Sequence, residues 1–195
     1  MQHAPMVNVK DPRAAEVLRF WFGEGADYGK ARKAWFQKNP EFDREIRTRF
    51  STLYEGAASG ALDAWQALPG ECLALVIALD QFPRNLHRGD AKAFASDGRA
   101  LGAARHAIES GYDAGMLPVE RLFLYLPFEH SENRDDQALA VELIGRLGNE
   151  EWTRFASDHK AMIDRFGRFP HRNAILGRES TPEEAAFLAQ PGSGF

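Results

Sequence analysis

An eight-residue run at positions 72–79 (CLALVIAL) is apolar on every side and constrains the fold more than any other segment. The run ends at Asp80 and falls far short of the ~18 apolar residues of a membrane span. In a chain with 27% charged residues, such a run is typical of a helix that other elements cover on all sides. We therefore expect a central helix, a core packed around it, and no integral membrane segment.

Apolar residues recur at helical spacing along almost the whole chain, whereas the apolar-polar alternation typical of strands is scarce. Helices are expected to begin at Asp11, Asn39 and Pro118, where capping residues or prolines stand. Thr181 and Glu184 have the spacing of a capping box for a short last helix. Other helices are expected over residues 91–108, 135–147 and 150–166. The sequence thus predicts an all-α fold.

The length of 195 residues and the 44% hydrophobic content suit one domain with a substantial core. We expect a flexible segment at residues 1–10, a single helical domain over residues 11–190 and a frayed tail at residues 191–195. The tryptophans follow no regular period, so a solenoid with a clear sequence repeat is not predicted.

The net charge and the cysteine content indicate which binding partners and which cellular compartment to expect. The 24 basic residues against 28 acidic ones give a net charge of −4, which disfavours a surface for nucleic acid or for an anionic membrane. The lone Cys72 forbids an internal disulfide and fits a reducing cytosol. The start of the chain lacks the pattern of a secretory signal. We expect a cytoplasmic protein that binds neither nucleic acid nor membrane.

Two segments share a Phe-Pro step followed by arginine and asparagine: DQFPRN at positions 80–85 and RFPHRN at positions 168–173. Because a proline disfavours helical geometry in the residue before it, we expect Pro83 to end the central helix and to leave Arg84 and Asn85 in a loop. Two similar helix exits would explain the likeness of the segments, and so would two turns that converge on one pocket.

A second apolar helix runs into the segment PFEHSE at positions 127–132. Pro127 is expected to break or kink that helix, which would place Glu129 and His130 beside a cavity. A histidine titrates near pH 6.5, about neutrality, and a neighbouring carboxylate raises its pKa, so the two side chains together could move protons. Glu129 and His130 are therefore the candidate catalytic residues.

Three arginines, at positions 165, 168 and 172, stand close together and need anions. A planar guanidinium binds carboxylate or phosphate through two hydrogen bonds, and asparagine adds a neutral donor and acceptor. If the two Phe-Pro segments converge, they would form a polar pocket for a small anionic ligand, with the PFEHSE segment as its wall. The candidate ligand-binding residues are Arg84, Asn85, Arg168, His171, Arg172 and Asn173.

The same side chains also fit a purely structural role. Asp80, Glu129 and Glu132 could supply the anions, and a carboxylate at the end of a wholly apolar helix costs several kcal/mol without a partner. Under this alternative the arginines, glutamates and histidines form ion-pair networks between helices. The chain would then be a helical interaction module for a protein or peptide partner.

Local metal and nucleophile motifs do not occur in the sequence. No histidine has a glutamate three residues before it, and neither His-Glu-x-x-His nor Gly-x-Ser-x-Gly is present. We predict no metal site, although Glu129, Glu132, His130 and His159 are the residues from which distant elements could assemble one. The sequence points to no particular cofactor, reaction or oligomeric state.

Four strings together resemble the bacterial family called domain of unknown function 924. They are VLRFWFGE at positions 17–24, LALVIALDQFPRN at 73–85, ERLFLYLPFEHSE at 120–132 and RFGRFPHRNAILGRESTPEE at 165–184. The resemblance spans nearly the whole chain and keeps the order of the strings. It implies an all-α fold with tetratricopeptide-like helical packing, without the usual repeat of about 34 residues, and it brings no established activity, substrate or cofactor.

Overall fold

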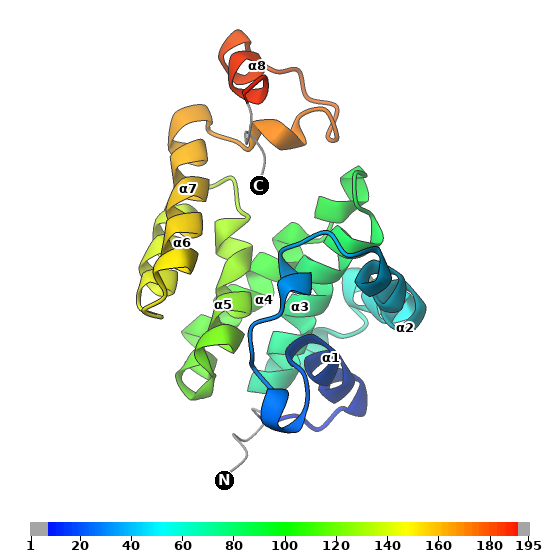
Figure 1. The fold of residues 1–195 in the computed structure, drawn as a ribbon. Coiled ribbons are helices and arrows are strands. Elements are labelled where there is room, and N and C mark those ends of the chain that lie inside the picture. Colours follow the sequence, from blue (N-terminus) through cyan, green and yellow to red (C-terminus); the bar gives the residue numbers. More distant parts are fainter. Residues whose placement is uncertain (1–7, 191–195) are drawn as a thin grey trace. The chain divides into compact units, whose positions relative to one another are not determined.

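The computed structural model describes residues 8–190, which form eight α-helices, six short 3-10 helices and no β-strand (Figure 1). The α-helices are α1 (Pro12–Phe22), α2 (Pro40–Ser59), α3 (Pro69–Leu86), α4 (Asp97–Glu109), α5 (Pro118–Glu129), α6 (Arg134–Gly145), α7 (Glu150–Phe166) and α8 (Pro182–Leu188). The predicted all-α fold is confirmed. The expected flexible start and frayed tail fall largely on residues 1–7 and 191–195, outside the described residues.

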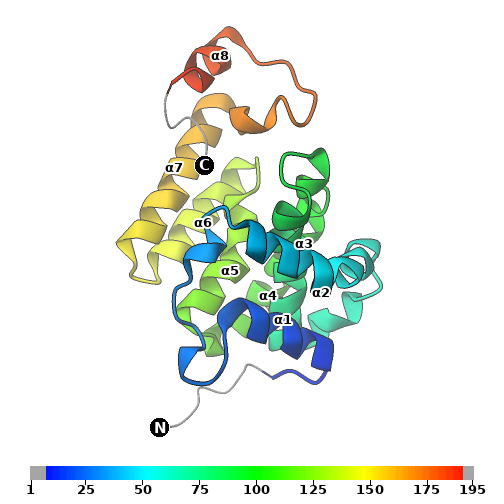
Figure 2. The same ribbon diagram turned by 45° about the vertical axis from the view of Figure 1, so that its right-hand side comes forward.

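The described residues divide into two compact units. The first comprises residues 8–88 and 92–127, and the second comprises residues 89–91 and 128–190. In the second unit, α6 and α7 lie side by side and are joined by a short turn (Figures 1 and 2). A single domain over residues 11–190 and tetratricopeptide-like packing stay predictions.

Helix α3 is the axis of the first unit. Its residues 70–83 are all buried, and α1, α2, α4 and the 3-10 helix η3 (Asp63–Ala67) contact it. Phe82 stacks on Phe50 of α2, with ring centroids 4.9 Å apart. Burial raises the pKa of the Cys72 thiol to about 12, so this cysteine is an inert core side chain. The predicted central helix is confirmed.

The predicted helix starts follow from capping by short polar side chains. Asp11 accepts a hydrogen bond from a backbone N–H in the first turn of α1, and Asn39 accepts two in the first turn of α2. Thr181 and Glu184 form the complete capping box of α8. Gly60 ends α2 with a φ of 90°, which side chains other than hydrogen rarely allow. The predicted helix starts at Asp11 and Asn39 and the predicted capping box are confirmed.

The prediction that Pro83 ends the central helix is wrong. Helix α3 continues through Pro83 to Leu86, so the following arginine and asparagine are helical. Proline has no N–H to donate to the carbonyl four residues earlier, which here belongs to Leu79. The Ser96 hydroxyl donates to that carbonyl instead, at 2.6 Å. A tertiary hydrogen bond thus replaces the one that the proline removes.

Two further expectations need correction. Residues 91–108 do not form one helix, because the chain turns at Ser96 between the 3-10 helix η4 (Ala91–Phe94) and α4. Pro127 does not break helix α5, which runs on to Glu129, and a kink at this proline stays a prediction. The predicted helices at 135–147 and 150–166 are confirmed as α6 and α7.

None of the helices within residues 8–190 is both long enough and apolar enough to cross a membrane.

Replacing Ser96 with alanine is expected to lower the free energy of unfolding by about 1–3 kcal/mol, because the Leu79 carbonyl would stay buried without a donor. Urea unfolding measures the loss. In the background of Pro83→Ala, residue 83 regains an N–H for the same carbonyl, so Ser96→Ala should cost less there. Equal costs in both backgrounds would contradict this account of the helix.

Candidate functional site

The candidate ligand-binding residues belong to different units. Arg84 and Asn85 lie in the last turn of α3, in the first unit, and the other candidates lie in the second. The two Phe-Pro segments also differ in backbone, because Pro83 lies inside α3 whereas Pro170 opens the 3-10 helix η6 (Pro170–Arg172). Their likeness in sequence therefore does not reflect two similar turns. A pocket that both segments share stays a prediction.

Arg84 binds two carboxylates of the first unit. Its guanidinium donates to both carboxylate oxygens of Asp97, at 2.9 and 3.1 Å, and lies 3.4 Å from a carboxylate oxygen of Asp80. Gln81 donates a further bond of 2.6 Å to Asp80, which is 1% exposed. Burial opposes the charge on Arg84, but Asp80 and Asp97 outweigh it and raise the pKa of the guanidinium. Arg84 thus neutralises a buried carboxylate, as the structural alternative expects.

Asn85 is also engaged within the first unit. Its amide donates to a carboxylate oxygen of Asp43 at 2.7 Å, and Arg88 donates to both oxygens of the same carboxylate. Asp43 lies in the first turn of α2, so these contacts tie the end of α3 to the start of α2. They are further contacts of the structural kind.

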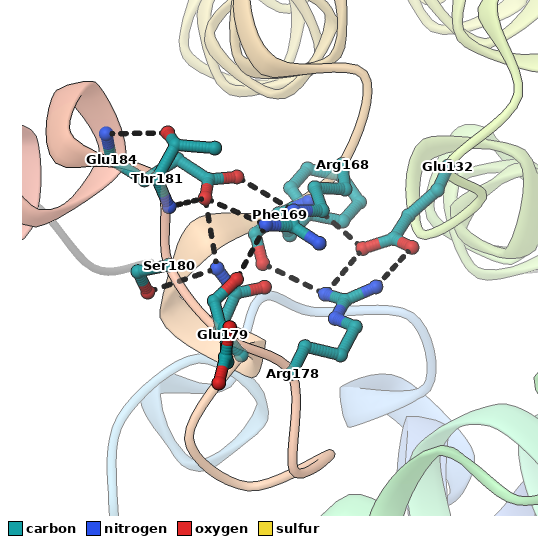
Figure 3. Close-up of polar contacts among 9 residues, drawn as sticks. Glu132, Arg168, Phe169, Arg178, Glu179, Ser180, Thr181 and Glu184 are labelled. Atoms are coloured by element: carbon teal, nitrogen blue, oxygen red, sulfur yellow. Dashed lines mark hydrogen bonds and ion pairs between the residues drawn. The ribbon is translucent and has the colours of Figure 1, made fainter.

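Arg168 binds Glu184 in the second unit (Figure 3). Nε and Nη2 of the arginine donate to the two carboxylate oxygens at 2.6 and 2.7 Å, and Nη2 also donates to the Glu179 carbonyl at 2.8 Å. Hydrogen bonds from Arg168 lower the pKa of Glu184 to about 2. Because Glu184 is 2% exposed, this fork of bonds neutralises a buried carboxylate and holds α8.

Glu132, whose side chain is half-buried, and Arg178 form a second pair joined by two hydrogen bonds (Figure 3). The guanidinium donates to both carboxylate oxygens at 2.7 and 3.0 Å, and the backbone N–H of Phe169 donates to the same carboxylate at 2.8 Å. Burial opposes the charge on Glu132, but these donors outweigh it and lower its pKa. Sequence reasoning missed Arg178, since it follows the Phe-Pro segment and no spacing links it to Glu132.

Asn173 keeps one polar atom without a partner. Its amide nitrogen donates to the Ser180 hydroxyl at 3.1 Å and to Glu184 at 3.3 Å. Its side-chain oxygen is buried and has no hydrogen-bond partner among residues 8–190, although the residue is only 1% exposed. Buried acceptors are normally satisfied, so this oxygen is open to a donor from a ligand or a water molecule.

Glu129 lies beside His159, which sequence reasoning considered only as a distant metal ligand. A carboxylate oxygen of Glu129, at the end of α5, lies 3.2 Å from Nδ1 of His159, which α7 contributes. The two side chains are 6% and 12% exposed, respectively. The ring of His130 lies 6.4 Å from the ring of His159. Proton transfer between Glu129 and His130 stays a prediction, and His159 joins the candidates.

The contacts of His159 fix which of its ring nitrogens carries the proton. Nδ1 lies 2.9 Å from the backbone carbonyl of Phe155, which can only accept a hydrogen bond. We therefore assign the proton of the neutral ring to Nδ1, where both the carbonyl and Glu129 can accept it. Nε2 is then the acceptor of the ring. The Glu129 carboxylate and the Phe155 carbonyl thus hold the ring in this tautomer and orientation.

The Phe169 ring gathers the cationic and aromatic side chains of this region. The Arg172 guanidinium stacks over it, with its carbon 4.4 Å from the ring centroid, and donates to the His130 carbonyl at 3.1 Å. The rings of His159 and His171 both lie 5.6 Å from the same ring. Arg172 is 6% exposed. One guanidinium and two imidazoles thus surround a single buried phenyl ring.

Both of these imidazoles are neutral at pH 7. Burial lowers the pKa of His159 to about 3, against the hydrogen bond to Phe155, and the positive groups nearby act in the same direction as burial. Burial and the charge of Arg172 lower the pKa of His171 to about 4. The two rings therefore present nitrogen acceptors beside a permanent cation.

Neither a metal centre nor the hollow beside α8 is a better candidate for a site in the second unit. No group of three or more His, Cys, Asp or Glu side chains within residues 8–190 could hold a metal ion. An open hollow of about 450 Å³ lies in the second unit, but its arginines are paired with its own glutamates. Its lining residues are Arg165, Phe166, Arg168, Thr181, Glu183 and Glu184.

Comparison with known proteins identifies the family and the fold of this chain, and it gives no activity. Residues 17–192 match the family described as bacterial protein of unknown function, DUF924. A solved structure of a protein of unknown function from Agrobacterium tumefaciens is 41% identical, with a TM-score of 0.82 over 90% of this chain and 96% of that one. No curated protein matches.

Arg168→Ala is expected to lower the urea midpoint of unfolding much more than Arg146→Ala, because Arg168 neutralises a buried carboxylate while Arg146 pairs with Glu142 at the surface. Arg168→Lys should recover only part of the loss, since an ammonium cannot form the fork of bonds. Equal midpoints for the two alanine variants would favour a ligand-facing role for Arg168.

The stability of the protein should fall on acidification through His159. In the unfolded chain this histidine binds a proton at about pH 6.5, whereas in the fold its pKa is about 3, so lowering the pH between these values favours unfolding. His159→Asn keeps a donor near Nδ1 but does not titrate. Between pH 7 and 4.5 this variant should lose about 2–3 kcal/mol less stability than the parent, as chemical unfolding would measure.

The matched control is His106→Gln in the first unit. It also replaces a histidine whose ring nitrogen contacts a backbone carbonyl, because Nε2 of His106 lies 3.0 Å from the carbonyl oxygen of Gln66. Parallel pH profiles for His159→Asn and the parent protein would show that the His159 ring is not buried in its neutral form.

Proposed function

Because the chain belongs to DUF924, a bacterial family of unknown function, we propose from its side chains that the second unit binds a small anionic ligand around Arg172. The Arg172 site comprises Arg172, His171, Asn173, His130, His159 and Glu129. Arg84 and Asn85 belong to the first unit and Arg168 binds Glu184, so this narrower site leaves them out.

The observation that carries the proposal is the setting of Arg172. Its guanidinium is buried and held flat on Phe169, in a region from which water is largely excluded. A charge acts more strongly there than in water, and the field of Arg172 contributes to the low pKa of His171. An anion of matching size would meet a cation that is already oriented.

Two further features support the binding of a ligand at these residues, in addition to a role in the packing of the fold. The buried side-chain oxygen of Asn173 has no hydrogen-bond partner among the described residues, and it could accept from an O–H or N–H of the ligand. The Glu129–His159 pair supplies a neutral imidazole that a carboxylate and a backbone carbonyl hold in place. Acid-base chemistry on a bound ligand would use this pair.

The alternative function, a helical module for a protein or peptide partner, is favoured by the other arginines. Arg84, Arg168 and Arg178 each bind carboxylates of their own unit, as side chains of a structural network do. If no anion binds, this alternative is the better account.

A cytoplasmic location is part of the proposal. It is supported by the single cysteine, which is a buried thiol with no role in a disulfide. Fractionation of bacterial cells that produce the protein would test it.

Thermal unfolding and calorimetry with phosphate, phosphate esters, sulfate and dicarboxylates test the anion site. At least one of these anions should stabilise the protein, and Arg172→Gln should weaken its binding about 10- to 100-fold through loss of charged hydrogen bonds. Arg165→Gln is the matched control, because Arg165 is a nearby arginine paired with Glu183 at the surface. The proposal fails if no anion binds, or if a folded Arg172→Gln variant binds as well as the parent.

A further inference from the structure

We infer that a hollow of the first unit binds a linear zwitterion, a molecule with an ammonium group at one end and a carboxylate at the other, such as a short peptide with free termini. The hollow has a volume of about 470 Å³ and is lined by side chains of α1, of α2 and of the loop that joins them. All of its residues belong to the first unit, so the inference goes beyond the anion site proposed around Arg172.

The hollow has an aromatic floor. Phe20 of α1 lines it, and the centroid of this ring lies 5.0 Å from the ring centroids of Phe42 and of Phe50. The guanidinium carbon of Arg32 lies over the Phe42 ring at 5.8 Å, and that of Arg49 lies over the Phe50 ring at 5.1 Å. Because Phe42 and Phe50 are eight residues apart on α2, about 12 Å, the two cations lie toward different ends of the hollow.

The end at Arg49 carries an excess of negative charge. Arg49 donates to Glu45 at 2.9 Å and to Glu16 at 3.2 Å, in each case to a single oxygen of the carboxylate. The other oxygen of each glutamate has no hydrogen-bond partner among residues 8–190. Two carboxylates thus share one guanidinium, and their remaining oxygens can accept hydrogen bonds from an ammonium group.

The end at Arg32 carries an excess of positive charge. Nη1 of Arg32 donates to the backbone carbonyls of Phe20 and Trp21 in the last turn of α1, which fixes the guanidinium. No carboxylate in the described part of the chain pairs with Arg32. Arg19 has a single ion pair, of 3.4 Å, with the exposed Glu24. Two guanidinia thus line the hollow beside one carboxylate, and their N–H groups can donate to a carboxylate of the ligand.

The uneven pairing distinguishes this hollow from the one in the second unit. There, Arg165 and Arg168 pair one to one with Glu183 and Glu184. Exposed ion pairs contribute little to stability, so folding does not by itself require opposite charges at the two ends of a hollow. A ligand with one charge of each sign would meet an opposite charge at both ends, whereas a ligand with a single charge would meet one at only one end.

The length of the hollow indicates the length of the ligand. Its lining residues on α1 run from Glu16 to Gly23, a distance of about 10 Å at 1.5 Å per residue. Three extended residues span about 10 Å, so the two termini of a tripeptide can reach both ends. An ω-amino acid with a comparable number of chain atoms has the same reach. In glycine the two charges lie too close together to do so.

Triglycine and two singly charged derivatives provide the test, with calorimetry on the whole protein at pH 7. Triglycine should bind about five- to tenfold more tightly than N-acetyl-triglycine, which lacks the ammonium group, and than triglycine amide, which lacks the carboxylate. Glycine should bind more weakly than triglycine. The ω-amino acid 8-aminooctanoate carries the same two charges without peptide groups. Equal binding of 8-aminooctanoate and triglycine assigns the hollow to linear zwitterions in general, and tighter binding of triglycine assigns it to peptides.

Two variants separate the ends of the hollow. Arg19→Gln removes one cation and should abolish the preference for triglycine over triglycine amide. Glu45→Gln neutralises one carboxylate at the other end and should abolish the preference for triglycine over N-acetyl-triglycine. Both changes affect exposed ion pairs, so the variants should fold. The matched controls are Arg146→Gln and Glu142→Gln, which alter an exposed ion pair in the second unit and should bind triglycine like the parent protein.

The outcomes separate this inference from the proposed function. Failure of triglycine and 8-aminooctanoate to bind, or equal binding of the three tripeptides by the parent protein, overturns the inference. So do folded Arg19→Gln and Glu45→Gln variants that keep both preferences. Arg172→Gln should bind triglycine as the parent protein does, so the anion site and the zwitterion site can each fail without the other.

Discussion

A carboxylate that leaves water costs several kcal/mol unless N–H groups or cations replace its lost hydration, and several segments that are far apart in this chain are joined at such carboxylates. Glu71 on α3 accepts from the backbone N–H groups of Lys10 and Asp11, both at 2.8 Å, just before α1. Glu120 on α5 accepts from the hydroxyl of Tyr28 at 2.6 Å. Each buried acid joins segments far apart in the chain, so the acids help to decide which segments pack together.

The same requirement explains how the arginines of the second unit are used. Glu132 and Glu184 are each bound by a fork of hydrogen bonds, from Arg178 and Arg168, and these pairs hold the chain between α7 and α8. A cluster of arginines in a sequence therefore indicates buried or half-buried acids as readily as it indicates a ligand. Arg172 lies on the Phe169 ring beside the neutral imidazole of His171, and its charge also helps to lower the pKa of Glu132.

Local signals in the sequence predicted most of the helices, since capping residues and apolar faces act within one or two turns of a helix. Asp11, Asn39 and Thr181 start their helices as expected, and Gly60 ends one. The expected end of α3 at Pro83 is wrong because a side chain from another part of the chain supplies a missing hydrogen bond. Pro83 would end an isolated helix, but Ser96 binds the carbonyl that the proline leaves without a donor.

The sequence by itself determined that this chain is all-helical, that the run at positions 72–79 is buried, and which polar segments are unusual, because periodicity and capping depend on neighbours in the chain. Only the tertiary structure decided the partners of those polar side chains. It brought Arg178 to Glu132 and His159 to Glu129, pairs that are 46 and 30 residues apart, respectively, in the chain. No spacing rule links such residues, since their contact follows from the packing of whole helices and loops.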